Sequence, residues 1–394
     1  MSLKKKLVYA SKILPGASLR ALSPSVSDRV HLIIAMADHF EPAIDPGDGQ
    51  SRVPRSEQES RLEWWSHEYP KVVERWRDHD GRPFLHTHFY PAEQYDEGLV
   101  ELLANHCHGG WGEVEVHLHH GTERPDTANN TQRLLSEFRD RLAFRHRCLA
   151  IEPGCNLPRY AFVHGNFALA NSAGGNDCGV DSELQILADT GCYADFTLPT
   201  GVGHRAQIRK INSVYECALP LDRPVAHREG TDLAAGRRPQ KLPLIVQGPL
   251  LADFRRGLRS PQFLFESGAV IRPNPMSLYR LRLWKRARIT VAGRPDWLFI
   301  KLHCHGMDPT QKDAVIGEPF RKFLEQLVTG AAERKETLHF VSAREMTNIL
   351  LAACDGRDGH PGEYRDYRFK RISDQPVVRT GVTEISHVPV GLKH

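Results

Sequence analysis

The hydrophobic positions along the chain predict a regular alternation of strands and helices. Near-continuous apolar runs at 30–37 and 297–302 are typical of strands buried on both faces of a parallel sheet, whereas 112–120 alternates between apolar and polar residues. Further strands are expected at 83–90, 158–164, 194–198 and 338–341. Apolar stripes with helical spacing predict helices at 56–78, 95–105, 129–144, 182–190, 278–286, 319–332 and 343–353. This order predicts an α/β fold built from βα units around a mostly parallel sheet or barrel.

Irregular segments interrupt this pattern in three places. Residues 1–28 are expected to be a leader, with a basic start but no apolar run long enough for a signal peptide. The α/β body then spans 29–354. Within it, 201–270 holds only short strand-like runs at 211–218 and 242–247, and we expect an irregular insertion or lid there. Residues 355–394 are polar and irregular, as in a loose C-terminal tail.

Charge and cysteine usage narrow the class of protein. A net charge of +4 over 394 residues gives no reason to expect a nucleic-acid partner. A locally basic stretch at 255–288 is either a solvated face or a contact for an anionic ligand.

No transmembrane run occurs, although the leader could touch a membrane surface. Eight scattered cysteines without a CxxC pair favour buried thiols and a cytoplasmic setting, with a Cys178–Cys192 disulfide as the alternative. The oligomeric state is not predicted.

Candidate chemistry lies at the ends of three predicted strands. The chain has 21 histidines, and the strand-end clusters are Asp38 with His39, then His117, His119 and His120, then His303 with His305. Because the carboxyl ends of parallel strands share one edge of a sheet, these clusters are expected to converge. One carboxylate with two or three imidazoles suits a borderline divalent cation such as Zn²⁺, Co²⁺ or Fe²⁺.

The order of these segments resembles the polysaccharide deacetylase, or NodB-like carbohydrate esterase, superfamily. The matching segments are the apolar strand ending in Ala37-Asp38-His39, then GEVEVHLHH at 112–120, HTHFYPAEQY at 86–95, YAFVHGNF at 160–167, GVDSELQILADTGCYADFTLP at 179–199 and FIKLHCHG at 299–306. The resemblance covers about residues 30–350. It implies a distorted (β/α) barrel and a metal-dependent hydrolase, with zinc as the expected metal and a carbohydrate as substrate.

Roles are carried over from the family residue by residue. Asp38 matches the general base and a metal ligand, and His39 replaces a metal-binding acid. Two of the three histidines at 117–120 would complete the metal site, and His303 or His305 matches the general acid. Substrate contacts are expected at Glu41, His88, Tyr90, His164 and Asn166. The chain departs from the family pattern in its Asp-His pair, its HLHH spacing and the missing arginine of the third motif.

Two other functions fit the same residues. A glycoside hydrolase on a related barrel would need two carboxylates, which Asp38 with Glu41 or Asp195 could supply without metal. A non-catalytic protein that binds or helps to assemble glycans would instead use aromatic surfaces such as Trp64, Trp65 and Tyr90. Insensitivity to a chelator would favour the first, and glycan binding without metal or acetate release would favour the second.

Overall fold

The computed structural model describes residues 16–19, 29–47, 52–200, 204–260, 262 and 264–375. The predicted leader at 1–28 lies outside the described residues, except for a helical turn at 16–19. Residues 376–394 of the predicted tail also lie outside them.

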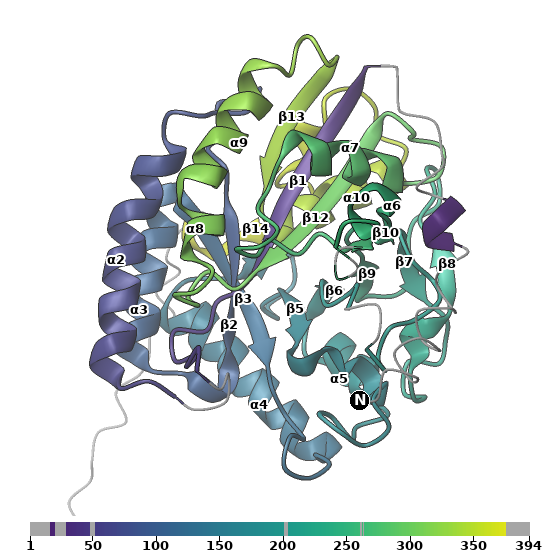
Figure 1. Ribbon diagram of the computed structural model, residues 1–394. Coiled ribbons are helices and arrows are strands. Elements are labelled where there is room, and N and C mark those ends of the chain that lie inside the picture. Colours follow the sequence, from purple (N-terminus) through teal and green to yellow (C-terminus); the bar gives the residue numbers. More distant parts are fainter. Residues whose placement is uncertain are drawn as a thin grey trace, which may run out of the picture.

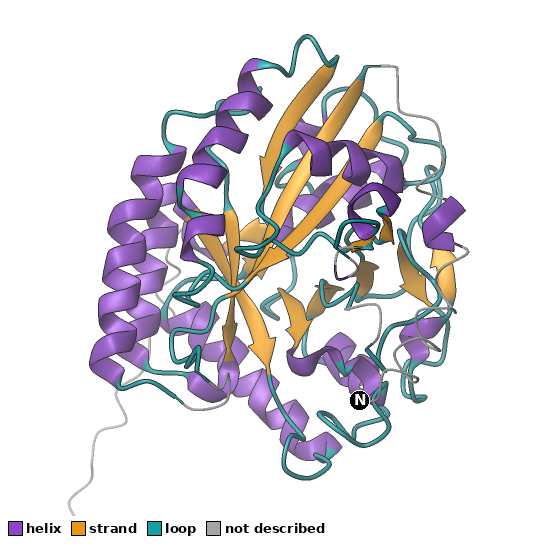
Figure 2. Cartoon of the chain, in the orientation of Figure 1, coloured by secondary structure: helices purple, strands orange, loops and turns teal. Residues whose placement is uncertain are grey.

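The described chain has a mixed α/β fold, with a large and mostly parallel central sheet among helices (Figures 1 and 2). The strands are β1 (Val30–His39), β2 (His86–Pro91), β3 (Gly112–Leu118), β4 (Ala150–Ile151), β5 (Tyr160–His164), β6 (Cys192–Asp195), β7 (Val214–Cys217), β8 (Gly230–Asp232), β9 (Leu244–Val246), β10 (Leu251–Ala252), β11 (Phe265–Glu266), β12 (Trp297–Cys304), β13 (Glu336–Val341) and β14 (Lys370–Arg371). The helices are α2 (Arg55–Val73), α3 (Glu97–His106), α4 (Ala128–Asp140), α5 (Glu183–Asp189), α6 (Phe254–Gly257), α7 (Leu278–Ala287), α8 (Lys312–Val315), α9 (Glu318–Thr329) and α10 (Ala343–Cys354).

The central sheet runs in the order β12-β1-β2-β3-β5-β6-β9-β7-β8, and β13 pairs with the first half of β1. All pairings in it are parallel except those of β7 with β8 and β9. Among the described residues the hydrogen-bonded path does not close into a ring. Because β1, β3, β5 and β12 run in the same direction, their carboxyl ends lie at one edge of the sheet.

Two apolar cores lie on the two faces of the sheet, and β1 contributes to both. Leu32, Ile34 and Met36 belong to the core that includes the buried side chains of α2, α3, α4 and α9. Ile33, Ala35 and Ala37 belong to the core that includes α10. Alternate side chains of a strand point to opposite faces, so a strand buried on both sides is apolar at nearly every position. We call these the α2 face and the α10 face.

The predicted insertion is part of the central sheet. β9 pairs in parallel with β6, and β7 and β8 extend the sheet beyond it as antiparallel strands. In its described part, the segment at 201–270 is therefore not a separate lid.

The first half of the predicted tail is packed against the body, although most of this half is irregular. Its β14 pairs with β4, and the side chain of Phe369 is fully buried. Arg365 donates hydrogen bonds to Asp78, Asp80 and Glu345. Residues 356–375 are therefore not a loose arm.

All eight cysteines are free thiols, and the alternative of a Cys178–Cys192 disulfide is not realised. Within the described ranges, no helix is both long enough and apolar enough to cross a bilayer.

Candidate metal centre

Adjacent residues at the end of β1 point to opposite faces of the sheet. Asp38 follows Met36 onto the α2 face, where its Oδ2 lies 2.9 Å from Nδ1 of His86 and its Oδ1 accepts a 2.6 Å hydrogen bond from the Gly306 N–H. His39 follows Ala37 onto the α10 face and meets other histidines there. The two side chains therefore belong to different groups.

Five imidazoles gather where β1, β3 and β12 end. The ring centroid of His39 lies 5.0 Å from that of His117, 4.8 Å from that of His305 and 6.3 Å from that of His303. His119 packs edge-on against His117 at 4.5 Å. The three strand ends thus bring their histidines together, as their parallel direction requires.

A carboxylate from the loop after β1 completes this group. Oε1 of Glu41 lies 3.3 Å from Nε2 of His117 and 3.1 Å from Nε2 of His119. Its Oε2 lies 4.0 Å from Nε2 of His305. Glu41 was expected as a substrate contact, but its position places it among the possible metal ligands.

The two histidines nearest Glu41 are oriented by hydrogen bonds on their far sides. Nδ1 of His117 donates to the Val163 carbonyl at 2.8 Å, and Nδ1 of His119 lies 2.8 Å from Oε1 of Glu93. Because these acceptors hold the Nδ1 hydrogens, both Nε2 atoms are directed at Glu41. Hydrogen bonding of the remote ring nitrogen is the usual way in which proteins orient a metal-binding histidine.

The charges of the group are strongly coupled. Burial by itself lowers the pKa of His119, but hydrogen bonds to Glu41 and Glu93 raise it to about 10. Burial raises the pKa of Glu41, yet its hydrogen bonds to His117 and His119 hold that pKa well below the usual range. Burial and the neighbouring His305 and His117 lower the pKa of His39 well below normal, so its ring is neutral. Without a metal, the group therefore holds an imidazolium between two carboxylates.

These residues fit a divalent cation. The ligand atoms of Glu41, His117 and His119 all lie within 4.8 Å of one another. Two imidazoles and one carboxylate form a common ligand set of catalytic zinc sites, which leave a further position for water or substrate. Nε2 of His39 and Nδ1 of His303 are also buried close by, without a hydrogen-bond partner in the described part of the chain.

A polar cavity of about 560 Å³ opens beside the group. Its volume falls within the range of about 300–1,000 Å³ typical of small-molecule sites. Most of its lining side chains are charged or carry hydrogen-bonding groups, and the lining residues are Glu41, Ala43, Ile44, Arg52, Glu93, Gln94, His119, Thr122, Glu123, Asn166 and Asp177. Asn166 therefore lies where a substrate contact was expected.

Three residues predicted for the site are buried on the α2 face instead. His88 packs against Phe40 and Trp65, and Tyr90 packs against Phe138 of α4. Asp38 is held by His86 and Gly306, as described above. All three are fully buried, and none of them lines the polar cavity beside Glu41, where His88 and Tyr90 were predicted to contact substrate. Asp38 was predicted as a base and metal ligand together with the histidines at 117–120, but it lies in a separate group with His86 and Cys304, and the ligand atoms of this group are also within 4.8 Å of one another.

His120 and His164 lie in a second buried group with Cys178 and Glu183, apart from the one around Glu41. Glu93, Cys178 and Glu183 belong to these groups but were not predicted as site residues from the sequence. Glu93 lies in a short 3₁₀ turn after β2, within the segment HTHFYPAEQY, but no periodic pattern distinguishes it as a site residue.

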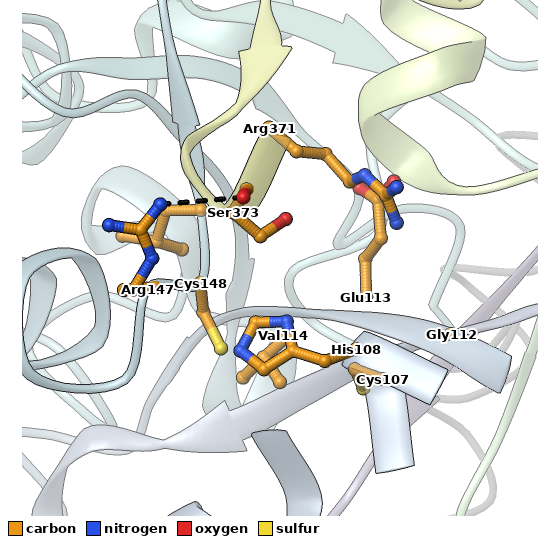
Figure 3. Close-up of a pocket in the computed structure, with 10 residues that line it drawn as sticks. Cys107, His108, Gly112, Glu113, Val114, Arg147, Cys148, Arg371 and Ser373 are labelled. Carbon is orange, nitrogen blue, oxygen red and sulfur yellow. Dashed lines mark hydrogen bonds between the residues drawn. The ribbon is translucent and has the colours of Figure 1, made fainter. Parts of the chain in front are cut away.

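A smaller cavity lies at the other end of β3, where Gly112 begins the strand (Figure 3). Its volume is about 20 Å³, which is room for about one water molecule. Arg147, Arg371 and Ser373 contribute to its lining, and Arg147 donates a 3.3 Å hydrogen bond to the Ser373 carbonyl. This cavity belongs to the packing of the C-terminal segment, and none of the histidines around Glu41 lines it.

Fold and site together define an α/β protein with buried His, Cys and Glu groups that could hold metal ions. No family model matches the chain, and a search of the curated proteins returns no significant match.

Proposed function

We propose that the protein is a metal-dependent hydrolase that removes N-acetyl groups from a polysaccharide or a glycan precursor. The proposal rests on the position of Glu41. Its Oε1 lies between Nε2 of His117 and Nε2 of His119, whose rings are oriented by hydrogen bonds on their far sides, and Glu41 also lines the polar cavity. The parallel run of strands from β12 to β9 is compatible with a distorted barrel of the polysaccharide deacetylase type, to which the chain's motifs are similar.

In this proposal Glu41, His117 and His119 hold the cation, with Zn²⁺ expected from the ligand types. When bound, such a cation polarises the acyl oxygen and lowers the pKa of water. His39, neutral and with a free Nε2, would accept a proton from the attacking water. His305, whose side chain is 35% exposed beside Glu41, would protonate the leaving amine. Asn166 and Arg52 would bind the substrate's polar groups from the cavity wall.

The character of the cavity supports a carbohydrate substrate. A sugar carries many hydroxyl groups, and each hydroxyl that loses water on binding requires a hydrogen-bonding partner. Carboxylates, an arginine guanidinium and side-chain amides line this cavity together with a few apolar residues. Such a lining fits a hydroxyl-rich ligand better than an apolar one.

The test combines metal analysis with acetate release from short N-acetylglucosamine oligomers. His117→Ala and His119→Ala should each lose the metal at this centre and reduce acetate release by at least ~100-fold, because the remaining ligands cannot hold the cation. His39→Gln should keep the metal and lose most of the activity. Asp38→Asn should keep the metal, because Asp38 lies on the other face of the sheet.

His67→Ala is the matched control, because this side chain is 70% exposed on α2. It should change neither metal content nor activity. Unchanged metal content at this centre in both His117→Ala and His119→Ala would refute the ligand assignment. Metal binding together with glycan binding, but without acetate release, would refute the hydrolase and favour a non-catalytic glycan-binding protein.

A glycoside hydrolase is the second candidate, because Glu41 and Glu93 both line the cavity and both contact His119. The other carboxylates considered for this chemistry, Asp38 and Asp195, are fully buried. Cleavage of a glycosidic bond that persists in the presence of a chelator would favour this candidate over the deacetylase.

A further inference from the structure

A second group of potential ligands lies on the α2 face, behind the candidate centre. Nε2 of His120 lies 3.1 Å from Nε2 of His164 and 2.9 Å from Oε1 of Glu183. Nε2 of His164 lies 3.3 Å from the same oxygen, and Sγ of Cys178 lies 3.6 Å from the Oε2 atom of Glu183. The four ligand atoms all lie within 4.8 Å of one another.

Adjacent elements of the fold bring these side chains together. His120 follows β3, and His164 ends β5, which pairs in parallel with β3. Glu183 is the first residue of α5, and Cys178 lies in the loop that leads to that helix. His120 is 5% exposed and the other three residues are fully buried, so the group has no face open to solvent.

The outward atoms of the group are held by other hydrogen bonds. Nδ1 of His120 lies 2.9 Å from Oδ2 of Asp126, and Nδ1 of His164 faces the Gly165 carbonyl. Oε2 of Glu183 accepts a 2.6 Å hydrogen bond from the Ala170 N–H. Acceptors therefore hold both Nδ1 hydrogens, and the two Nε2 atoms turn their lone pairs toward each other.

Nε2 of His120 and Nε2 of His164 lie 3.1 Å apart, and both face Oε1 of Glu183. A hydrogen between the two rings satisfies only two of the inward atoms, whereas a divalent cation at the centre of the group would satisfy all four at once.

We propose that His120, His164, Cys178 and Glu183 form a second, structural zinc site. Two imidazoles, a thiolate and a carboxylate suit Zn²⁺, and four buried protein ligands close the coordination sphere, as in structural zinc sites. On binding, the Cys178 thiol and the inward nitrogen of His120 each lose a proton, and the cation takes the place of these protons. This inference does not depend on the proposed hydrolase activity.

The site would stabilise the loop between β5 and α5. Five non-glycine residues of this loop have positive φ, and they are Asn166, Phe167, Ala170, Asn171 and Asp177. This left-handed conformation is unfavourable for residues with a side chain, and most of all for Phe167 and Ala170, because only Asn and Asp adopt it readily. His164 and Glu183 lie at the two ends of the loop and Cys178 within it. A common cation would therefore hold the loop in place, including Asn166 and Asp177 at the cavity wall.

The experiment uses Co²⁺, because a cobalt–thiolate bond gives a charge-transfer band in the near ultraviolet and the Glu41 centre has no sulfur ligand. Full-length protein freed of metal and titrated with Co²⁺ should develop this band. Cys178→Ser should lose the band and one equivalent of bound cobalt. His117→Ala should keep the band while it loses the other equivalent, and Cys155→Ser should keep both.

Asp126→Asn provides a milder variant that leaves all four ligands in place. Loss of the carboxylate behind His120 should weaken cobalt affinity, followed by the same band, by about 10- to 100-fold. The proposal is overturned if folded wild-type protein develops no band with Co²⁺, or if the band persists in folded Cys178→Ser. The first outcome requires no variant, so misfolding of a variant cannot mask it.

Discussion

At the scale of single residues, Asp38 and His39 show how one step along a strand changes the role of a side chain. Asp38 binds the backbone N–H of Gly306 in the turn after β12 and thereby positions the loop that carries His305. A Cβ on Gly306 would lie 2.3 Å from Oδ2 of Asp38, so the close approach requires glycine. Asp38 therefore supports the loop of the candidate centre from the opposite face of the sheet.

Folding lowers the pKa of His31, at the start of β1, so that its imidazole is neutral in the native protein. Its Nδ1 lies 2.9 Å from Nε2 of His339, whose own Nδ1 lies 2.8 Å from Oδ2 of Asp80. Since His339 directs its Nδ1 hydrogen to Asp80, its Nε2 is free to accept a hydrogen bond from His31. Burial, followed by the nearby His339 and His360, lowers the pKa of His31 to about 4.

This lowered pKa predicts a loss of stability in acid. Above pH ~6.5 His31 is neutral in both states, but between pH ~6.5 and ~4 the unfolded chain binds a proton that the folded chain does not. After allowance for partial exposure, His31 should account for about 1 kcal/mol of the stability lost over that range. Urea unfolding at pH 7.5 and pH 4.5 should show a correspondingly smaller loss in His31→Gln. His67→Gln is the exposed control, and identical pH dependence in wild type and His31→Gln would contradict the assignment.

At the scale of elements, a buried ion pair joins β11 to α7. The side chains of Glu266 and Arg280 are at most 1% exposed. Nη2 of Arg280 donates to Oε1 of Glu266 at 2.6 Å, and its Nε donates to Oε2 at 2.8 Å. The Trp284 indole N–H and the Gly268 backbone N–H also donate to Oε1. Four donors thus compensate for burial of one carboxylate.

Glu266→Ala should be strongly destabilising, because it leaves the Arg280 guanidinium buried without its counter-ion. We expect a loss of about 3–5 kcal/mol in the free energy of unfolding, measured by urea denaturation. Glu229→Ala is the matched control, since its pair with Arg223 is exposed and should contribute less than about 1 kcal/mol. Equal losses in the two variants would show that the buried pair does not stabilise this region.

At the scale of the whole molecule, the segment after α10 completes the core on the α10 face. The ring of Phe369 stacks on Tyr193 of β6, with 4.9 Å between centroids. Its backbone N–H donates to Oδ1 of Asn348, and its carbonyl accepts from Arg344. The C-terminal segment thereby covers apolar side chains on the α10 face of the sheet and forms part of that core.

Phe369→Ala should cost about 3–5 kcal/mol of stability, because it leaves a cavity between this segment and the sheet. Phe144→Ala makes the same truncation at a side chain that is 68% exposed and should have little effect. Thermal unfolding of both variants beside the wild type would compare them. Similar melting temperatures for the two variants would mean that the C-terminal segment contributes little to the core.

The sequence alone determined the elements, because their hydrophobic periods are local properties of the chain. Each predicted helix and strand overlaps an observed one, from β1 at the start to α10 at the end. The alternation in β3 correctly placed Glu115, His117 and the other odd-numbered residues on one face. Parallel strand direction correctly implied that the histidines after β1, β3 and β12 would meet.

Only the tertiary structure decided which side chains form each group. A strand buried on both faces is apolar throughout, so its sequence does not reveal that His39, and not Asp38, turns toward His117. Glu93 and Cys178 lie on turns and loops, and their positions depend on backbone conformations that no periodic pattern encodes. Periodicity along the chain specifies elements and their buried faces. Which distant loops meet depends on how the helices and strands pack against one another. The ligand groups can therefore be identified only from the tertiary structure.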